Sequence, residues 1–482
     1  MNTEERFSSS PSWEGTIHPE WAHRLVRLEG TLQLVGVVLV VARFGIGDSA
    51  GVPLGIWMTG YLLVVLGMTG GFVLRYLWSR RRGSFLRENW HLPMFSLLWL
   101  VGCFVSAFAV GALDELTSSL MHWPAMITWT EWIILAQGVI AFVSVVKGVS
   151  AHGYNPTLIL VLSFVILIGI GTILLMMPRS RVQLGETPRI DHAPFLTALY
   201  TSTSASCVTG LAIVHTGDYW TRFGQTVIMG LIQIGGLGIM TFGAIFAIAA
   251  GRKLEIREAA TFQNLLESER MRDVPRMIGA IAAVTFGTEL IGAALLTTLW
   301  PELPWSERMY YGLFHAVSSF CNAGFTLTPD NLVGMADRWQ VWGVISSLII
   351  IGGLGFAVNY NILLVFWSKI GQIRSNPLFD LPRTRLRLTL SSKMVLSVTG
   401  SLLVLGTIGV LLLEATSPGA LRTLGERIDQ KLANAWFQSV TCRTAGFNAV
   451  DIGQLNPATK LFSIILMFIG ASPGSTGGGV KT

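Results

Sequence analysis

Three short stretches decide the fold of this chain: SASCVTGL (204–211), SSFCNAGF (318–325) and VTCRTAGF (440–447). In each of them, a segment rich in serine or threonine ends at a small residue, which a glycine and then a bulky apolar residue follow. The glycines lie 114 and 122 residues apart, at Gly210, Gly324 and Gly446. An apolar span precedes each stretch and another follows it, so the chain repeats one unit of span, short segment and span.

The position of these glycines suits a carbonyl-lined pore. A half-helix that enters a membrane from the outside points the partially negative end of its dipole at the membrane centre. The extended segment after it can aim backbone carbonyls at a shared axis, where they replace the water of a dehydrated cation. Glycine leaves such a pore open and adopts unusual backbone angles. The alternative is that the glycines only let helices pack closely, but three copies in register favour the pore.

A further glycine cluster lies in the second span of each unit. GGLG occurs at 235–238 and at 352–355, and GASPGSTGGGVKT (470–482) takes the corresponding place in the third unit. We therefore expect each of these spans to break in mid-membrane. The third cluster also resembles the phosphate-binding loop GxxxxGK[ST], which would make the protein a membrane ATPase. Val480 stands where that motif needs its lysine, so the sequence favours an enlarged third copy of GGLG.

Composition predicts a polytopic helical membrane protein. The 482 residues are 51% hydrophobic and only 13% charged, whereas soluble domains are about 25% charged. Four cysteines are too few for a disulfide framework, and no constellation of nucleophile and base indicates an enzyme. The net charge of +6 comes from basic residues in short loops, which is typical of membrane topology and not of nucleic-acid binding. Stretches long enough to cross about 30 Å of hydrocarbon lie at 31–47, 54–77, 93–113, 129–146, 156–177, 223–250, 277–299, 341–367, 394–415 and 457–480.

Shorter segments at 194–208, 307–321 and 431–442 cannot span and are expected to be re-entrant half-helices. Arginines before the first span and after the second indicate, by the positive-inside rule, a cytoplasmic N-terminus in a plasma or inner membrane. The basic loops after 250 and after 367 fall on the same side only if the three short segments return to the outer side. The predicted topology is therefore self-consistent.

Several chemically distinctive residues lie beside the three stretches. Cys207, Cys321 and Cys442 precede the glycines, but they belong to different units and lack the CxxC spacing of a metal site, so packing is favoured. His315 lies inside a short segment, where a packed histidine is favoured over a ligand.

Four carboxylates leave two interpretations open. Glu289 lies inside an apolar span, where it either has a function or bonds a neighbouring helix. Asp218, Asp330 and Asp451 follow the glycines by five to eight residues. They either concentrate cations at the mouth of a pore or are ordinary loop carboxylates.

From residue 156 to 482 the sequence resembles the Trk/Ktr/HKT superfamily of potassium transporters. The motifs SxxxVTGL, FCNAGF, RTAGFN, GGLG and SPGSTGGGVKT occur in the order of that superfamily. The resemblance implies an all-α membrane protein of tandem span–pore-helix–span repeats, like four linked copies of a potassium-channel subunit around one pore. It implies passive potassium uptake without a cofactor, by a homodimer in the lipid membrane on a cytosolic nucleotide-binding regulatory ring. A sodium-conducting relative stays open, because selectivity in the superfamily depends on glycine or serine in the filter.

The resemblance also implies roles for individual residues. Three residues of each unit would form a selectivity filter, namely Val208, Thr209, Gly210, Asn322, Ala323, Gly324, Thr444, Ala445 and Gly446. The third glycine cluster would form an intramembrane gate, namely Gly470, Ser472, Pro473, Gly474, Ser475, Thr476, Gly477, Gly478 and Gly479.

The sequence departs from the superfamily pattern in two ways. Four additional spans occupy 31–146 without the regular arginines of a voltage sensor, so we expect an accessory scaffold. No fourth unit is present, so we expect a sequence truncated inside the second span of the third unit. The predicted divisions are 1–150 for the tail and accessory helices, and 151–255, 256–375 and 376–482 for the three pore repeats.

Overall fold

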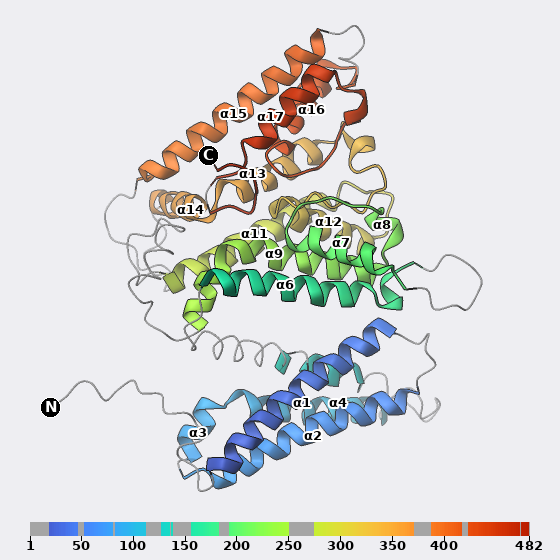
Figure 1. Ribbon diagram of the computed structural model, residues 1–482, viewed down its shortest axis with the longest axis vertical. Coiled ribbons are helices and arrows are strands. Elements are labelled where there is room, and N and C mark those ends of the chain that lie inside the picture. The colour runs from blue at the N-terminus through green and yellow to red at the C-terminus, as the bar shows by residue number, and fades with distance from the viewer. Residues whose placement is uncertain are drawn as a thin grey trace, which may run out of the picture. The chain divides into compact units, whose positions relative to one another are not determined.

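The computed structural model describes residues 19–46, 53–80, 82–111, 127–134, 136–137, 156–182, 192–249, 274–370, 387–416, 423–472 and 474–481. Every regular element of this described part is a helix, and only isolated β-bridges occur beside them. The predicted all-α class is therefore confirmed. The chain forms two compact parts, an N-terminal part (Met1–Val149) and a C-terminal part (Ser150–Thr482) (Figure 1). The finer division into three pore repeats stays a prediction.

The N-terminal part is built on a tightly packed pair of long helices. Its elements are α1 (Pro19–Ile46), α2 (Leu54–Trp78), α3 (Arg82–Glu88) and α4 (His91–Gly111). Glycines of α2 let α1 approach closely, because a Cβ on Gly67 would lie 2.7 Å from Cδ1 of Leu32. A Cβ on Gly71 would lie equally close, at 2.7 Å, to Oε1 of Glu29. The glycines of α2 therefore set the spacing of the pair.

Two buried charge networks tie the N-terminal part together. Arg75 donates from Nε to Oε1 of Glu29 at 3.0 Å, and both side chains are buried. The buried carboxylate of Glu131 accepts from Arg43 and, at 3.0 Å, from the hydroxyl of Tyr61. Breaking one partner of such a pair leaves an uncompensated buried charge. These pairs are consistent with a rigid body, and the expected scaffold role stays a prediction.

The C-terminal part repeats one unit of long, short and long helices three times, and these repeats are called the first, second and third units (Figure 1). In each copy the first long helix packs on the short one: α6 on α7, α11 on α12 and α15 on α16. The short helices α7, α12 and α16 match the predicted segments 194–208, 307–321 and 431–442 to within three residues. Their bounds and those of the long helices are α6 (Pro156–Leu175), α7 (Phe195–Ser206), α9 (Arg222–Ala249), α11 (Val274–Leu296), α12 (Trp305–Phe320), α13 (Ser346–Leu354), α14 (Phe356–Ile370), α15 (Leu390–Ala415), α16 (Ile428–Thr441) and α17 (Pro457–Phe468).

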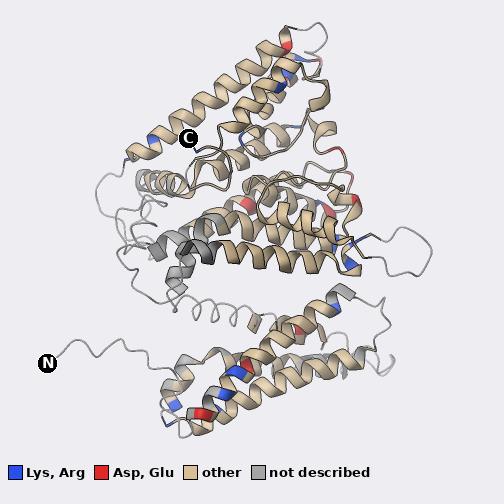
Figure 2. Cartoon of the chain, viewed as in Figure 1, with Lys and Arg blue, Asp and Glu red and all other residues tan. Residues whose placement is uncertain are grey.

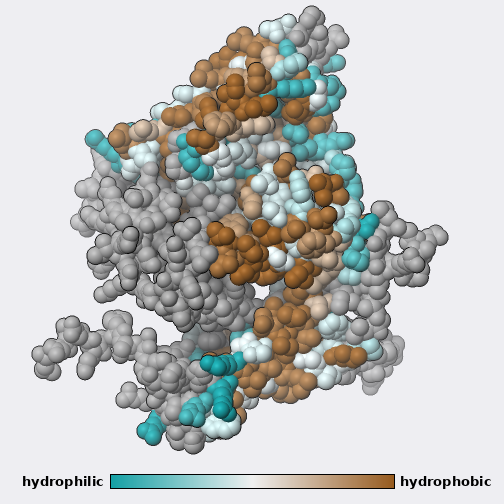
Figure 3. Space-filling model, in the orientation of Figure 1, coloured by the Kyte–Doolittle hydropathy of each residue, from teal (hydrophilic) through white to brown (hydrophobic). Residues whose placement is uncertain are grey.

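Apolar length agrees with a membrane location. Within the described part, three helices are long and apolar enough to cross a membrane: Arg24–Arg43, Gly55–Trp78 and Leu390–Ala415. The pair Gln340–Leu354 and Val358–Phe366, bent by 108°, counts as a fourth if it forms one span. Shorter apolar helices occupy parts of other predicted spans, and most of 129–146 lies outside the described residues. Charged residues are sparse along the helices, and apolar side chains cover much of the visible surface (Figures 2 and 3).

The expected breaks at the glycine clusters occur in two units and not in the first. The helix of the second unit ends at Leu354 and restarts at Phe356, because Gly355 between them takes a φ of +88°. In the third unit α17 ends at Phe468, before the glycines begin. The expectation for GGLG at 235–238 is wrong, since α9 continues through it. Its glycines keep negative φ, so nothing turns the chain out of the helix.

Candidate functional site

The three motif stretches share one unusual backbone conformation. In each, the residue two before the glycine and the glycine itself take a positive φ, while the residue between them does not. Such alternation turns consecutive carbonyl groups toward the same side. A positive φ outside glycine costs about 1–3 kcal/mol and concentrates at functional sites. The angles are 56° and 77° for Val208 and Gly210, 57° and 71° for Asn322 and Gly324, and 70° and 78° for Thr444 and Gly446. We call these three segments the filter segments.

The preceding short helix holds each filter segment through its backbone. The amide of the residue before the glycine donates to a carbonyl near the end of the short helix, five residues back in the first two units and four residues back in the third. The donors and acceptors are Thr209 to Ser204 at 2.9 Å, Ala323 to Ser318 at 2.7 Å and Ala445 to Thr441 at 3.0 Å. This repetition shows that the strained conformation is imposed by the fold and is not a local accident.

The hydroxyl groups of the same three helix residues add a second brace. Ser318 donates its hydroxyl to the carbonyl oxygen of Phe325 at 2.8 Å, and Thr441 donates to that of Phe447 at 2.7 Å. In the first unit, the hydroxyl of Ser204 instead accepts from that of Thr209 at 2.9 Å. Buried hydroxyls that hold a backbone carbonyl fix its direction, which a carbonyl-lined site requires. The sequence analysis noted the Ser/Thr-rich character of these helices but did not single out these residues.

The filter segments lie against one another in chain order. A Cβ on Gly210 would lie 2.3 Å from the carbonyl oxygen of Ala323, and a Cβ on Gly324 would lie 2.6 Å from that of Ala445. A Cβ on Gly446 would meet only the Cα of Gly324, at 3.7 Å, among the described residues. The structure therefore brings the predicted filter residues of all three units together.

In the first two units, a glycine lets the second long helix approach the end of the short helix closely. A Cβ on Gly235 of α9 would lie 2.0 Å from the carbonyl oxygen of Ser206, the last residue of α7. A Cβ on Gly352 of α13 would lie 1.9 Å from the carbonyl oxygen of Phe320, the last residue of α12. The first glycine of GGLG thus serves close approach in both units, whether or not the helix breaks there.

The glycine-rich stretch after α17 folds back on itself, and its two ends meet in one parallel β-bridge between Ile469 and Val480. Gly470 donates its amide to the carbonyl of Val480 at 3.0 Å, and Ala471 donates to that of Gly478 at 3.1 Å. We call residues 469–481 the Gly-rich hairpin, with a stem (469–470 and 478–480) and a tip (471, 472 and 474–477). The predicted gate residue Pro473 lies outside the described residues.

The tip fills the break between α13 and α14. Ser472 donates its amide to the carbonyl of Gly353 at 3.1 Å, and Thr476 donates to that of Gly352 at 3.4 Å. Phe356, the first residue of α14, donates its amide to the carbonyl of Gly474 at 2.9 Å. Helix ends leave backbone groups without partners inside the helix, and here the hairpin supplies those partners to both sides of the break.

The same hairpin touches the filter segments of the second and third units. A Cβ on Gly477 would lie 2.6 Å from Oγ1 of Thr444 and 3.2 Å from Nδ2 of Asn322. Gly478 donates its amide to Oγ1 of Thr444 at 3.2 Å, and Arg443 donates from Nη2 to the carbonyl of Gly470 at 3.1 Å. Residues predicted to form the gate thus lie directly beside residues predicted to form the filter.

This arrangement disagrees with a phosphate-binding loop. Such a loop needs free amides that point into a common concavity. The amides of the hairpin instead donate to protein acceptors; those donors are Gly470, Ala471, Ser472, Ser475, Thr476, Gly478 and Val480. Lys481 donates to the carbonyl of Gly477, a backbone group of the hairpin itself.

His315 has a packing role, as the sequence favoured. Its ring is fully buried, with its centroid 4.7 Å from that of Trp300, which lies in the chain between α11 and α12. Leu327 donates its amide to Nε2 at 3.4 Å, so Nδ1 carries the hydrogen and donates to the carbonyl of Tyr311 at 2.8 Å. His315 therefore ties the chain after the second filter segment to α12.

The cysteines and the acidic residues have different surroundings. Cys321 is buried, and its Sγ would lie 2.8 Å from a Cβ on Gly236 of α9, which indicates packing. Glu289 is only 2% exposed, and its Oε1 has no hydrogen-bond partner in the described part, so its role stays open. Asp451 accepts the amide of Gly453 at 2.8 Å and caps a helical turn. Among the described residues, no group of three or more metal-ligating side chains forms a metal site.

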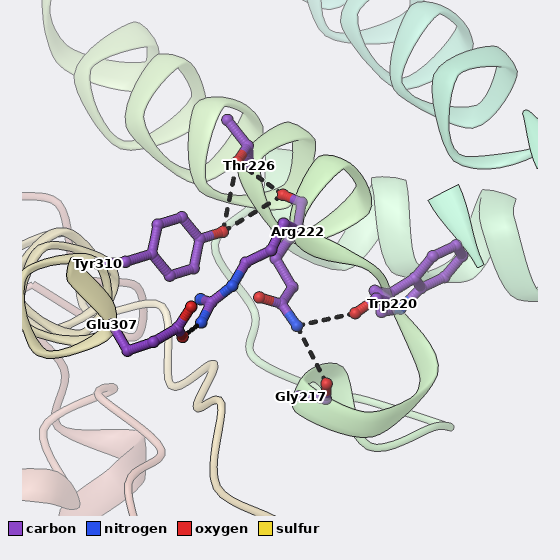
Figure 4. A network of polar contacts seen from close by, with 7 residues as sticks. Gly217, Trp220, Arg222, Thr226, Glu307 and Tyr310 are labelled. Atoms are coloured by element: carbon purple, nitrogen blue, oxygen red, sulfur yellow. Dashed lines mark hydrogen bonds and ion pairs between the residues drawn. The ribbon is translucent and has the colours of Figure 1, made fainter. Parts of the chain in front are cut away.

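A polar network joins the first two units away from the filter (Figure 4). Arg222, at the start of α9, pairs with Glu307, at the start of α12, and its guanidinium lies 4.1 Å from the ring centroid of Tyr310. Beside it, Gln225 donates to the carbonyls of Gly217 at 3.0 Å and Trp220 at 2.8 Å. Partly exposed ion pairs contribute little on their own, so this network aligns the two units more than it stabilises them.

Sequence reasoning missed Arg443 and the three bracing hydroxyls. A signal for the hydroxyls was present, because Ser204, Ser318 and Thr441 recur six, six and five residues before the glycines. No sequence signal pointed to Arg443, since its counterparts three residues before the glycine are cysteines.

Comparisons with known proteins show which family the chain is similar to. The TrkH family, described as cation transport protein, matches residues 132–482. The Ktr system potassium uptake protein B of Bacillus subtilis is 39% identical over 331 residues, which are 68% of each chain. The potassium/sodium uptake protein NtpJ of Enterococcus hirae is 38% identical over 334 residues, 68% of this chain and 67% of that protein.

Among solved structures, the potassium transporter TrkH from Vibrio parahaemolyticus aligns with a TM-score of 0.44 at 17% identity, over 80% of this chain and 71% of that one. The family match extends over more than half of the chain, and the family consists of transport proteins, so the protein is not an enzyme. From residue 132 onward, the chain belongs to the TrkH family of cation transport proteins.

Proposed function

We propose that this protein takes up potassium ions across a membrane through a pore that the filter segments line with backbone carbonyls. The observation that supports this most is the same alternation of positive and negative φ in all three segments. Rings of backbone carbonyls replace the water shell of a dehydrated cation. The contacts of Gly210 with Ala323 and of Gly324 with Ala445 bring those carbonyls close enough to act on one ion.

The names of the relatives support potassium as the transported ion and leave sodium as an alternative. The relative from Bacillus subtilis is described as a potassium uptake protein, and NtpJ is described as a potassium/sodium uptake protein. The filter of this chain has glycine at each of the three described positions, which leaves the pore free of side chains. We therefore favour potassium, and the sodium-conducting alternative is decided by the measurement below.

We further propose that the Gly-rich hairpin is the gate. Irregular backbone at the depth of a membrane is tolerated only where protein buries it or where it lines a cavity. The hairpin meets that condition because its amides bond to α13 and to the third filter segment. Its close approach to Asn322 and Thr444 supports a role in obstructing an ion that leaves the filter.

The proposed setting of the protein follows from the superfamily resemblance. We propose a homodimer in the plasma or inner membrane with a cytoplasmic N-terminus. A cytosolic nucleotide-binding ring would engage the basic segments around 252–276 and 369–393. Most of these two segments lies outside the described residues.

The function is tested by flux through the full-length transporter in liposomes. Uptake of radioactive rubidium, a potassium analogue, is measured against increasing external potassium or sodium. Potassium should compete at much lower concentration than sodium if the filter prefers potassium. Equal competition by sodium would favour the sodium-conducting alternative, and the absence of any flux above that of empty liposomes would contradict the proposed function.

A further inference from the structure

We propose that Arg443 and Thr444 fasten the stem of the Gly-rich hairpin to the third filter segment, so that only the tip moves when the pore opens. The inference rests on the gating function proposed above. It assigns positioning roles to two adjacent residues and divides the gate into a fixed part and a moving part.

The two residues hold opposite arms of the stem. Arg443 donates from Nη2 to the carbonyl of Gly470 in the first arm at 3.1 Å. Thr444 accepts at Oγ1 from the amide of Gly478 in the second arm at 3.2 Å. The arms themselves are joined by the bond from the amide of Gly470 to the carbonyl of Val480. The backbone of the third filter segment therefore cannot separate from the stem without breaking contacts on both arms.

Arg443 is unusual because it is a buried cation without a carboxylate partner. Its exposed fraction is 9%, and no carboxylate of the described part lies within ion-pair distance of it. In the other two units, the position three before the glycine holds Cys207 and Cys321. A buried charge needs compensation, and Arg443 finds it at the carbonyl that follows α17, where the partially negative end of that helix lies. Its place in the fold therefore depends on the hairpin stem.

The stem has another feature that fixes it in place. Gly470 and Gly479 approach so closely that a Cβ on Gly470 would lie 2.5 Å from the Cα of Gly479. In the first two units the corresponding glycine lies against the end of the short helix instead. In the third unit the long side chain of Arg443 reaches from the end of the short helix to Gly470. This hydrogen bond takes the place of the direct backbone contact in the other two units.

The tip makes a different set of hydrogen bonds, which reach the break in the second unit. Its amides and carbonyls bond to Gly352, Gly353 and Phe356 at the break, and the hydroxyl of Thr476 donates to the carbonyl of Phe320 at 3.1 Å. These contacts cross between units, whereas the stem contacts stay within the third unit. Opening therefore releases the contacts between units and keeps those within the unit.

A cysteine pair tests the moving part, and substitutions of Arg443 test the fixed part. A Cβ on Gly353 would lie 3.8 Å from the Cβ of Ala471, which is close to the mean separation of about 3.8 Å in disulfides. The pair Gly353→Cys and Ala471→Cys thus joins the base of the tip to α13. At the stem, Arg443→Gln removes the charge that reaches the carbonyl of Gly470, whereas Arg443→Lys keeps a charge at this position.

Rubidium flux is measured for each full-length variant, and for the cysteine pair under oxidation and under reduction, with disulfide formation checked by mass spectrometry. Oxidation should lower the flux of the Gly353/Ala471 pair about tenfold or more, because the closed state alone is populated. Arg443→Gln should raise the maximal flux without changing the half-saturating potassium concentration, and Arg443→Lys should restore the lower flux. The unsubstituted transporter, oxidised in parallel, controls for its native cysteines.

The other outcomes discriminate between the two proposals. If oxidation stops the flux of the cysteine pair but Arg443→Lys and Arg443→Gln have equal effects, the fastening proposed here is overturned while the gate stands. If oxidation leaves the flux of the cysteine pair unchanged, the hairpin is not the gate, and the proposed function loses that part. Should the cysteine pair fail to fold, the two Arg443 variants still test the fastening.

Discussion

Thr476 donates its side-chain hydroxyl to the carbonyl oxygen of Phe320, although the two residues lie 156 positions apart. Phe320 is the last residue of α12, and the second filter segment follows it. Thr476 belongs to the tip of the Gly-rich hairpin, which extends from the third unit. One hydrogen bond thus connects the proposed gate of one unit with the filter support of another.

Removal of residues 472–477 should raise cation flux and not abolish it. Apart from Ala471, the deletion removes the tip that lies beside Asn322 and Thr444, while the stem contacts of Gly470 and Gly478 are kept. The measurement is rubidium uptake into potassium-starved cells, normalised to the amount of protein in the membrane. Uptake that falls to background at a normal protein amount would rule out the gating role.

A single hydroxyl should give a graded version of the same effect. Thr476→Val keeps the shape of the side chain but removes the donor to Phe320, which should weaken docking of the tip by about 1 kcal/mol and raise flux modestly. Thr59→Val is the matched control, because its exposed hydroxyl donates to the carbonyl of Gly55 one turn away in its own helix. Equal flux changes in both variants would show that the Phe320 contact has no special role.

Ser318→Ala should weaken ion discrimination. The substitution removes the donor to the carbonyl of Phe325 at a cost of about 1 kcal/mol, so the backbone after the second filter segment loosens. The control is Ser347→Ala, whose exposed hydroxyl bonds to Gly343 one turn away. The ratio of potassium to sodium permeability should fall for Ser318→Ala alone, and an unchanged ratio would speak against a bracing role.

Two glycines of α9 should respond in opposite ways to alanine. A Cβ on Gly235 would collide with the carbonyl of Ser206, so Gly235→Ala should destabilise the fold by about 1–3 kcal/mol. A Cβ on Gly230 meets nothing within 4 Å, so Gly230→Ala should be neutral or stabilise the helix by up to about 1 kcal/mol. Thermal unfolding in detergent, followed by size-exclusion chromatography, measures both. A loss of similar size at Gly230 would contradict the close approach of α9 and α7.

The helical pattern was predictable from sequence because it rests on local signals. Long apolar runs and short Ser/Thr-rich segments mark the long and short helices, and α7, α12 and α16 lie close to where they were expected. The break at GGLG was not predictable in the same way, since the motif is intact in both α9 and α13. What differs is the φ of Gly355, which the docking of a distant hairpin supports through the amide of Phe356.

The candidate site could be named from the motifs, but its contacts could not. The register of Gly210, Gly324 and Gly446 is visible in the sequence because equivalent positions recur at similar intervals. The bond of Arg443 to Gly470 is visible only in three dimensions, because it replaces with a side chain what the other units achieve by backbone proximity. Irregular features of one repeat leave no periodic signal.

The most direct test of the account is the reversal potential of Gly446→Ser in mixed potassium and sodium solutions. Gly446 takes a φ of +78°, which strains any residue with a side chain, and a Cβ there meets only the Cα of Gly324 among the described residues, so a serine has space but disturbs the third filter segment. Gly334→Ser is the control, since that glycine is exposed and its Cβ meets nothing within 4 Å. The account requires Gly446→Ser to shift the reversal potential toward that of sodium while Gly334→Ser matches the unsubstituted protein. An unchanged reversal potential in Gly446→Ser, at normal protein amount, would contradict a filter built from these glycines.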